Sequence, residues 1–116
     1  MDSPLAPVAR LEVDLVRTVG RLRTLGLARL AASFEPEPTR ADAAHALAQR
    51  LADRTADLEG HPGRRVPRLS DAAVGDQVAV CGHDLLEALS SCSDRQRASM
   101  VAASAADDLL DLRRRV

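Results

Sequence analysis

Aromatic side chains are almost absent from this sequence, which holds one Phe and no Tyr or Trp. The interior must therefore be filled by Leu, Val and Ala. Ala has the highest helix propensity of all residues, and the Val residues do not form the alternating runs that are typical of strands. The lack of aromatics also removes the rings on which nucleic-acid bases stack. The composition favours an α-helical protein.

Lys, Ile and Asn are missing as well, so that all 16 basic residues are Arg. We attribute this bias to the codon usage of a GC-rich, bacterial genome. The Arg residues are offset by 17 acidic residues, which leaves a net charge of −1. A general nucleic-acid-binding protein needs a basic excess that neutralises phosphates. We therefore expect no nucleic-acid partner.

Long hydrophobic runs are also absent, since no apolar stretch approaches the ~20 residues of a membrane-spanning helix. The N-terminus, MDSPLAPVAR, carries an acid and two prolines where a signal peptide has a basic region and an apolar core. We expect a soluble, cytoplasmic protein without a membrane partner. At 116 residues, positions 1–116 are expected to form a single domain.

Cysteine is scarce, because Cys81 and Cys92 are the only two and cannot build a disulfide framework. Eleven residues apart in one predicted helix, they would lie about 16 Å apart along its axis, beyond disulfide reach. Both fall on the apolar face of that helix. We expect two buried, unreactive thiols.

The segment 6–34 has the strongest helical pattern in the chain. Apolar residues recur at steps of three and four, at Val8, Leu11, Leu15, Val19 and Leu22. Further apolar residues widen this stripe to roughly 200° of the helix surface, namely Leu5, Val16, Leu27, Leu30 and Phe34. Asp14 and three Arg residues fill the remaining arc. A surface helix needs an apolar arc of only about 100°, so this helix requires neighbours on at least two sides.

The helix boundaries follow from proline, glycine and capping residues. Ser3-Pro4 or Ala6-Pro7 starts the first helix, and the prolines in residues 35–38 end it. Thr39 caps the second helix in a pattern that is similar to a capping box, and Gly60 ends it. Helices are predicted over residues 6–34, 39–59, 70–91 and 93–114.

Four glycines fall inside these predicted helices, at Gly20, Gly26, Gly75 and Gly82. Each costs about 1 kcal/mol relative to Ala in a helix interior. We expect them at places where another helix approaches closely, and for Gly20 and Gly26 a kink in the helix is the alternative.

Short, long and short connections join the four helices, and the long one is the loop 61–69, HPGRRVPRL. This order predicts two helical hairpins joined by a longer crossover loop, packed as an all-α, antiparallel four-helix bundle. The predicted core comprises Leu15, Val19, Leu22, Leu47, Leu51, Val78, Leu85, Val101, Leu109 and Leu112.

His45 lies on the predicted solvent face of the second helix, among small residues. Its surroundings resemble those of histidine phosphotransfer domains, four-helix bundles whose second helix exposes a phosphoacceptor His followed by any residue, Leu, Lys and Gly. His45 and Leu47 match that motif, whereas Ala48 and Gln49 replace the Lys and the Gly. The resemblance implies a phosphocarrier that uses His45, and an ordinary surface histidine is the alternative.

No constellation of catalytic or metal-binding residues emerges. Asp76, His83 and Glu87 share one helix face, and Asp107 with Asp111 points outward from another helix, so we interpret both groups as solvated surfaces. No nucleophile has a visible base partner. We therefore expect no enzymatic activity, no metal and no cofactor.

Two surfaces are candidates for protein contacts. The crossover loop is basic at Arg64, Arg65 and Arg68 and either binds an acidic partner or is simply solvated. Apolar residues outside the expected core mark a contact surface, and the candidates are Val16, Leu27, Met100 and Leu110. The sequence thus predicts an interaction protein that binds itself as a two-fold dimer, or binds another protein.

Overall fold

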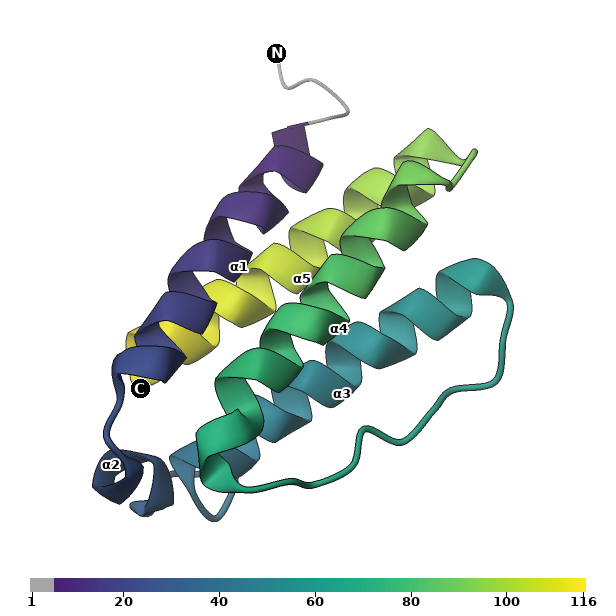
Figure 1. The fold of residues 1–116 in the computed structure, drawn as a ribbon. Coiled ribbons are helices and arrows are strands. Elements are labelled where there is room, and N and C mark those ends of the chain that lie inside the picture. Colours follow the sequence, from purple (N-terminus) through teal and green to yellow (C-terminus); the bar gives the residue numbers. More distant parts are fainter. Residues whose placement is uncertain (1–5) are drawn as a thin grey trace.

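The computed structural model describes residues 6–116, and the elements that it contains there are helical (Figure 1). They are α1 (Ala6–Thr24), α2 (Leu27–Ala31), α3 (Arg40–Glu59), the 3₁₀ turn η1 (Asp71–Ala73), α4 (Val74–Ser90) and α5 (Arg95–Arg115). The prediction of an all-α helical bundle is confirmed. Leu5 and the possible start at Ser3-Pro4 lie outside the described residues.

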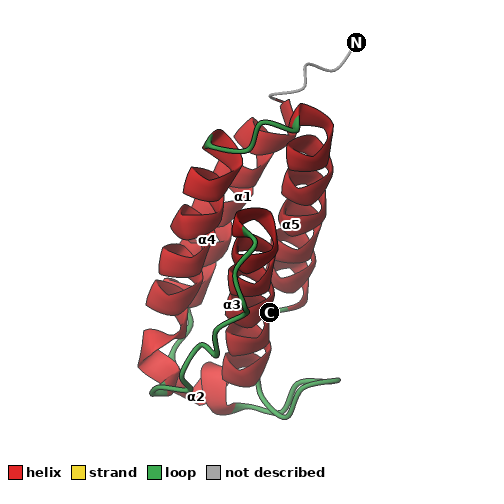
Figure 2. Cartoon of the chain, turned by 90° about the vertical axis from the view of Figure 1, so that its right-hand side faces the viewer, coloured by secondary structure: helices red, strands yellow, loops and turns green. Residues whose placement is uncertain are grey.

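The four long helices pack in an order that the sequence pattern does not reveal. The most extensive contacts join α1 to α5 and α3 to α4, with a smaller contact between α1 and α4. The helices of each of these two pairs run in the same direction, because the crossover loop returns along the whole of α3 before α4 begins (Figures 1 and 2). The successive helices α1 and α3 are antiparallel and lie across the bundle from each other, as do α4 and α5.

The predicted helix 6–34 is not continuous, which corrects the expectation from sequence. α1 ends at Thr24, and Gly26 takes an extended conformation with φ −68° and ψ 157° before α2 begins. At ~100° per residue, a straight helix would turn Phe34 away from the face that carries Leu11, Leu15 and Leu22. After the bend, Leu30 and Phe34 are both buried and Leu27 is exposed.

The second predicted helix is confirmed at both ends. The Thr39 hydroxyl accepts a hydrogen bond of 3.1 Å from the backbone N–H of Asp42, and Gly60 ends α3 in the left-handed conformation with φ 68°. The following loop is tied along α3 by two hydrogen bonds of one side chain. Gln49 donates to the Arg64 carbonyl and accepts from the Val66 N–H. These bonds hold the loop beside α3 (Figure 2).

The core is built from Leu, Val and Ala, as predicted. Of the ten predicted core residues nine are buried, whereas Val101 is half-buried and packs at the edge of the core. Gly82 allows the close approach that we expected, since a Cβ there would lie 2.6 Å from Leu15 Cδ2. No helix of the described chain approaches Gly20 or Gly26 in this way, because no atom of another helix lies within 4 Å of the corresponding Cβ position; Gly26 lies instead at the bend between α1 and α2.

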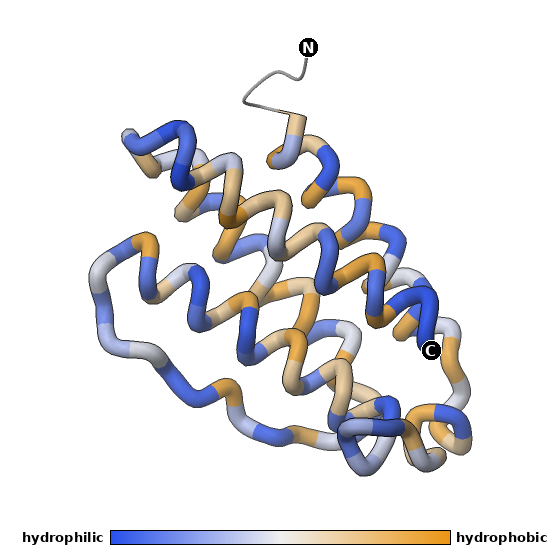
Figure 3. Tube along the Cα trace, turned by 180° about the vertical axis from the view of Figure 1, so that it is seen from behind, coloured by the Kyte–Doolittle hydropathy of each residue, from blue (hydrophilic) through white to orange (hydrophobic). Residues whose placement is uncertain are grey.

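Hydrophobic and hydrophilic residues alternate along the helices (Figure 3), and the buried residues of each long helix recur at helical spacing. Within residues 6–116, no helix combines the length and the apolar composition that crossing a membrane requires.

Candidate functional site

The outward face of α1 is apolar. Val13 and Val16 are 49% and 70% exposed, and they lie on the side opposite the buried Leu11, Leu15 and Leu22. Exposed small residues extend this line along the helix at alternating steps of three and four. We call the resulting set, Ala6, Ala9, Val13, Val16 and Gly20, the α1 seam.

An open groove of about 540 Å³ adjoins the α1 seam on the side of α5. Ala9 and Val13 line it from α1, and Leu110 and Arg114 line it from α5. Leu110, one of the predicted contact residues, is half-buried here instead of fully exposed. The groove therefore joins Leu110 to the apolar face of α1.

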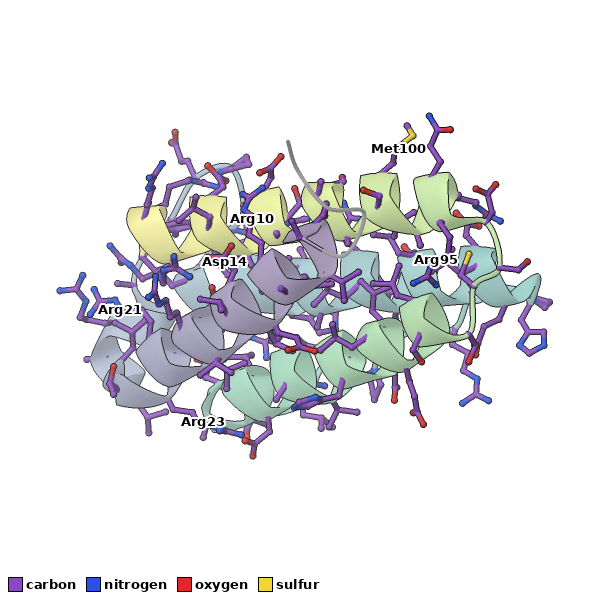
Figure 4. The ribbon with its side chains drawn as sticks, turned by 90° about the horizontal axis from the view of Figure 1, so that it is seen from above. Arg10, Asp14, Arg21, Arg23, Arg95 and Met100 are labelled. Carbon is purple, nitrogen blue, oxygen red and sulfur yellow. The ribbon has the colours of Figure 1, made fainter. Side chains whose placement is uncertain are left out.

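The other predicted contact residues lie apart from this surface. Leu27 is 62% exposed on α2, and Met100 is 68% exposed on α5. Figure 4 shows Met100 projecting outward from α5, well separated from Arg10 and Asp14. Val16 thus shares the α1 seam with Val13, which lines the groove together with Leu110, whereas Leu27 and Met100 do not belong to this surface.

Asp14 is buried, which corrects the expectation that it faces solvent. Its side chain is only 9% exposed and lies 3.0 Å from the Arg113 guanidinium of α5. Arg113 also donates to the buried Thr18 hydroxyl, which donates in turn to the Leu109 carbonyl. Buried ionic groups require such partners. This network joins α1 to α5 beneath the groove, and the sequence gives no local signal for it.

The expectation that His45 stands free in solvent is wrong. It is half-buried, and its Nε2 lies 2.8 Å from the carbonyl oxygen of Val66 in the crossover loop. A carbonyl oxygen can only accept a hydrogen bond, so Nε2 must carry the proton. A protonated nitrogen has no lone pair with which it could accept a phosphoryl group.

Arg68 is not available for an acidic partner, because its guanidinium donates to Asp71 at 2.8 Å and to Asp42 at 3.1 Å. The bond to Asp71 contributes most to raising the pKa of Arg68. The pKa of Asp42 is lowered, first by the hydrogen bond from the Thr39 hydroxyl and also by Arg68. These contacts fasten the end of the loop to the start of α3.

Arg64 lines a polar cleft of about 540 Å³ between the C-terminal parts of α3 and α4. Glu59, His61, Asp84 and Glu87 share this cleft, and Arg65 is exposed on the loop beside it. Of the three predicted basic residues, the structure therefore places only Arg64 at a concave surface.

The two thiols differ in environment. Cys81 is buried, and burial, with a smaller effect of Asp84, raises its pKa. A raised pKa leaves little of the reactive thiolate at neutral pH. Cys92 lies beyond the end of α4 and is half-buried, which corrects the expectation that it belongs to the helix and is buried.

Among residues 6–116, no three His, Cys, Asp or Glu side chains are grouped closely enough to hold a metal ion. Comparison of the chain with models of protein families, with curated proteins and with solved structures yields no match. The exposed apolar face of α1 therefore stands as the candidate functional surface on its geometry alone.

Proposed function

We propose that this chain is a non-catalytic, cytoplasmic interaction protein that binds a second copy of itself through an exposed apolar helix face. The observation that supports the proposal is the exposure of Val13 and Val16 together on α1. Apolar groups gathered outside the core of a monomer mark contact surfaces. The neighbouring groove with Leu110 enlarges the apolar area that a partner can cover.

Phosphotransfer by His45 is not supported by a comparable observation. The proton of Nε2 is engaged by the Val66 carbonyl, and Ala48 stands where the phosphotransfer motif has its Lys. Without that cation, the surroundings of His45 lack the charge that attracts a phosphate.

Sedimentation equilibrium tests the proposal. We expect the apparent mass to rise above the 12.4 kDa of the monomer as the protein concentration increases from micromolar values towards about 1 mM. A mass that stays at 12.4 kDa over this range refutes self-association.

A further inference from the structure

The α1 seam has the spacing of a coiled-coil contact line. Residues 6, 9, 13, 16 and 20 follow steps of three, four, three and four, which are the spacings of the a and d positions in a heptad repeat. In this numbering Ala6, Val13 and Gly20 occupy a positions, and Ala9 and Val16 occupy d positions. The line lies outside the core and is exposed along its whole length.

Gly20 also indicates that the natural neighbour of the seam lies outside the chain. In mid-helix it costs about 1 kcal/mol relative to Ala, and no atom considered within the described residues approaches within 4 Å of the place where its Cβ would be. Within this chain, the absence of a side chain at Gly20 therefore avoids no steric clash. Small residues at a helix contact line let a second helix come close.

The charges beside the seam select both the partner and its direction. Glu12 and Arg17 are exposed on opposite flanks, at g and e positions, and neither takes part in the ion pairs among residues 6–116. In a parallel pair, a g residue faces the e residue five positions later in the partner helix. Glu12 would thus face the partner's Arg17, and Arg17 the partner's Glu12. In an antiparallel pair, like charges would face each other.

The position of α1 in the bundle leaves room for this partner. Its neighbours α4 and α5 lie on either side of it, and α3 lies across the bundle. Arg10, the other basic residue next to the seam, is occupied by Asp14 and Asp107 of its own chain. A second α1 can therefore approach the seam along its whole length.

We propose that the α1 seam binds the α1 seam of a second copy in a parallel, two-fold arrangement, with Glu12 of each copy paired to Arg17 of the other. The inference rests on the proposed function and specifies its surface. The seam spans about 22 Å at 1.5 Å per residue, and two heptads are fewer than an independent coiled coil uses. The dimer is therefore weak and depends on protein concentration.

Sedimentation equilibrium of matched variants tests the surface. Val16→Asp should raise the dissociation constant at least tenfold, because it places a charge on the contact line. The matched control is Val80→Asp, which changes a valine that is 60% exposed on α4 and should shift the constant by less than about twofold.

Exchanging the charges at Glu12 and Arg17 tests whether the two α1 helices pair in the parallel direction. Glu12→Arg and Arg17→Glu should each weaken the dimer about tenfold, because two attractive pairs become repulsive. The variant with both changes should restore the affinity of the unaltered protein. In an antiparallel dimer, the single changes would have no such effect.

Oxidative cross-linking gives an independent check on direction, with Cys92→Ser as the background. Ala9→Cys and Gly20→Cys should each form a disulfide with its own counterpart in a parallel dimer. If Ala9→Cys cross-links only to Gly20→Cys, or if Val16→Asp leaves the dimer intact, the inference is overturned while self-association stands. A monomer at every concentration overturns both.

Discussion

The close contact between α1 and α4 makes Gly82 the most informative position for a single added methyl group. A Cβ at Gly82 would lie 2.6 Å from Cδ2 and 3.0 Å from Cγ of Leu15, which is itself buried at 2% exposure. The atoms that would clash belong to the end of the Leu15 side chain, which must move to admit the added methyl group. Gly82→Ala must therefore displace Leu15 or the helix.

The expected change in the free energy of unfolding for Gly82→Ala follows from two opposing effects. Replacing Gly with Ala in a helix interior gains about 1 kcal/mol, whereas forcing an extra methyl group into a packed core costs about 1–3 kcal/mol. Gly82→Ala should thus be neutral or destabilising by up to about 2 kcal/mol. The matched control is Gly20→Ala, where the added Cβ meets open space, and it should stabilise the monomer by about 0.5–1 kcal/mol.

Urea unfolding followed by far-UV circular dichroism at low protein concentration measures both variants. Leu15→Ala alone should cost about 2–5 kcal/mol, and in that background Gly82→Ala should become stabilising because the clash is gone. If Gly82→Ala stabilises the unaltered protein as much as Gly20→Ala does, the close packing of α4 on Leu15 is refuted.

Three further predictions concern stability. Leu85→Ala should cost about 2–5 kcal/mol of unfolding free energy, since Leu85 is fully buried, and a loss well below 1 kcal/mol in urea unfolding would contradict the orientation of α4. Asp14→Asn should cost about 1–3 kcal/mol because it leaves Arg113 without its buried carboxylate partner. Asp76→Asn, at an exposed ion pair, should cost under about 1 kcal/mol, and equal losses in the two variants would argue against a buried pair. Asp42 has a lowered pKa in the folded state, so its ionised form contributes stability above its ordinary pKa of 3.8 that is lost as the pH falls below that value. The difference in stability between the unaltered protein and Asp42→Asn should therefore be present at neutral pH and disappear in acid, and a difference that does not change with pH would refute this linkage.

The helical fold could be predicted because its signals are local. Thr39 and Gly60 fix the ends of α3 by short-range hydrogen bonds and backbone conformation, and the apolar period places Leu47 and Leu51 on the buried face. Such signals depend on a few neighbouring residues. They say which face of a helix is buried, but not which helix covers it.

The features that sequence reasoning missed depend on contacts between distant residues. Asp14 is buried because Arg113, 99 positions away, lies opposite it. His45 is covered because Gln49 holds the crossover loop against α3. Val66, which contacts His45, is 21 positions away from it in sequence, so a helical wheel assigns both His45 and Asp14 to solvent. The order in which the helices pack also depends on contacts between residues that are distant in sequence.

Of the α1 seam, only Val16 belongs to the apolar arc of roughly 200° that the sequence pattern predicts. That single arc hides Val13 and the heptad spacing of its neighbours. The structure divides that surface into two. Leu11, Leu15 and Leu22 are covered by α4 and α5, while the seam on the opposite side remains uncovered within residues 6–116. The inner neighbours of α1 belong to its own chain. In the proposed dimer, the heptad spacing of the outer residues and the charges of Glu12 and Arg17 would let a second copy of α1 cover the other side.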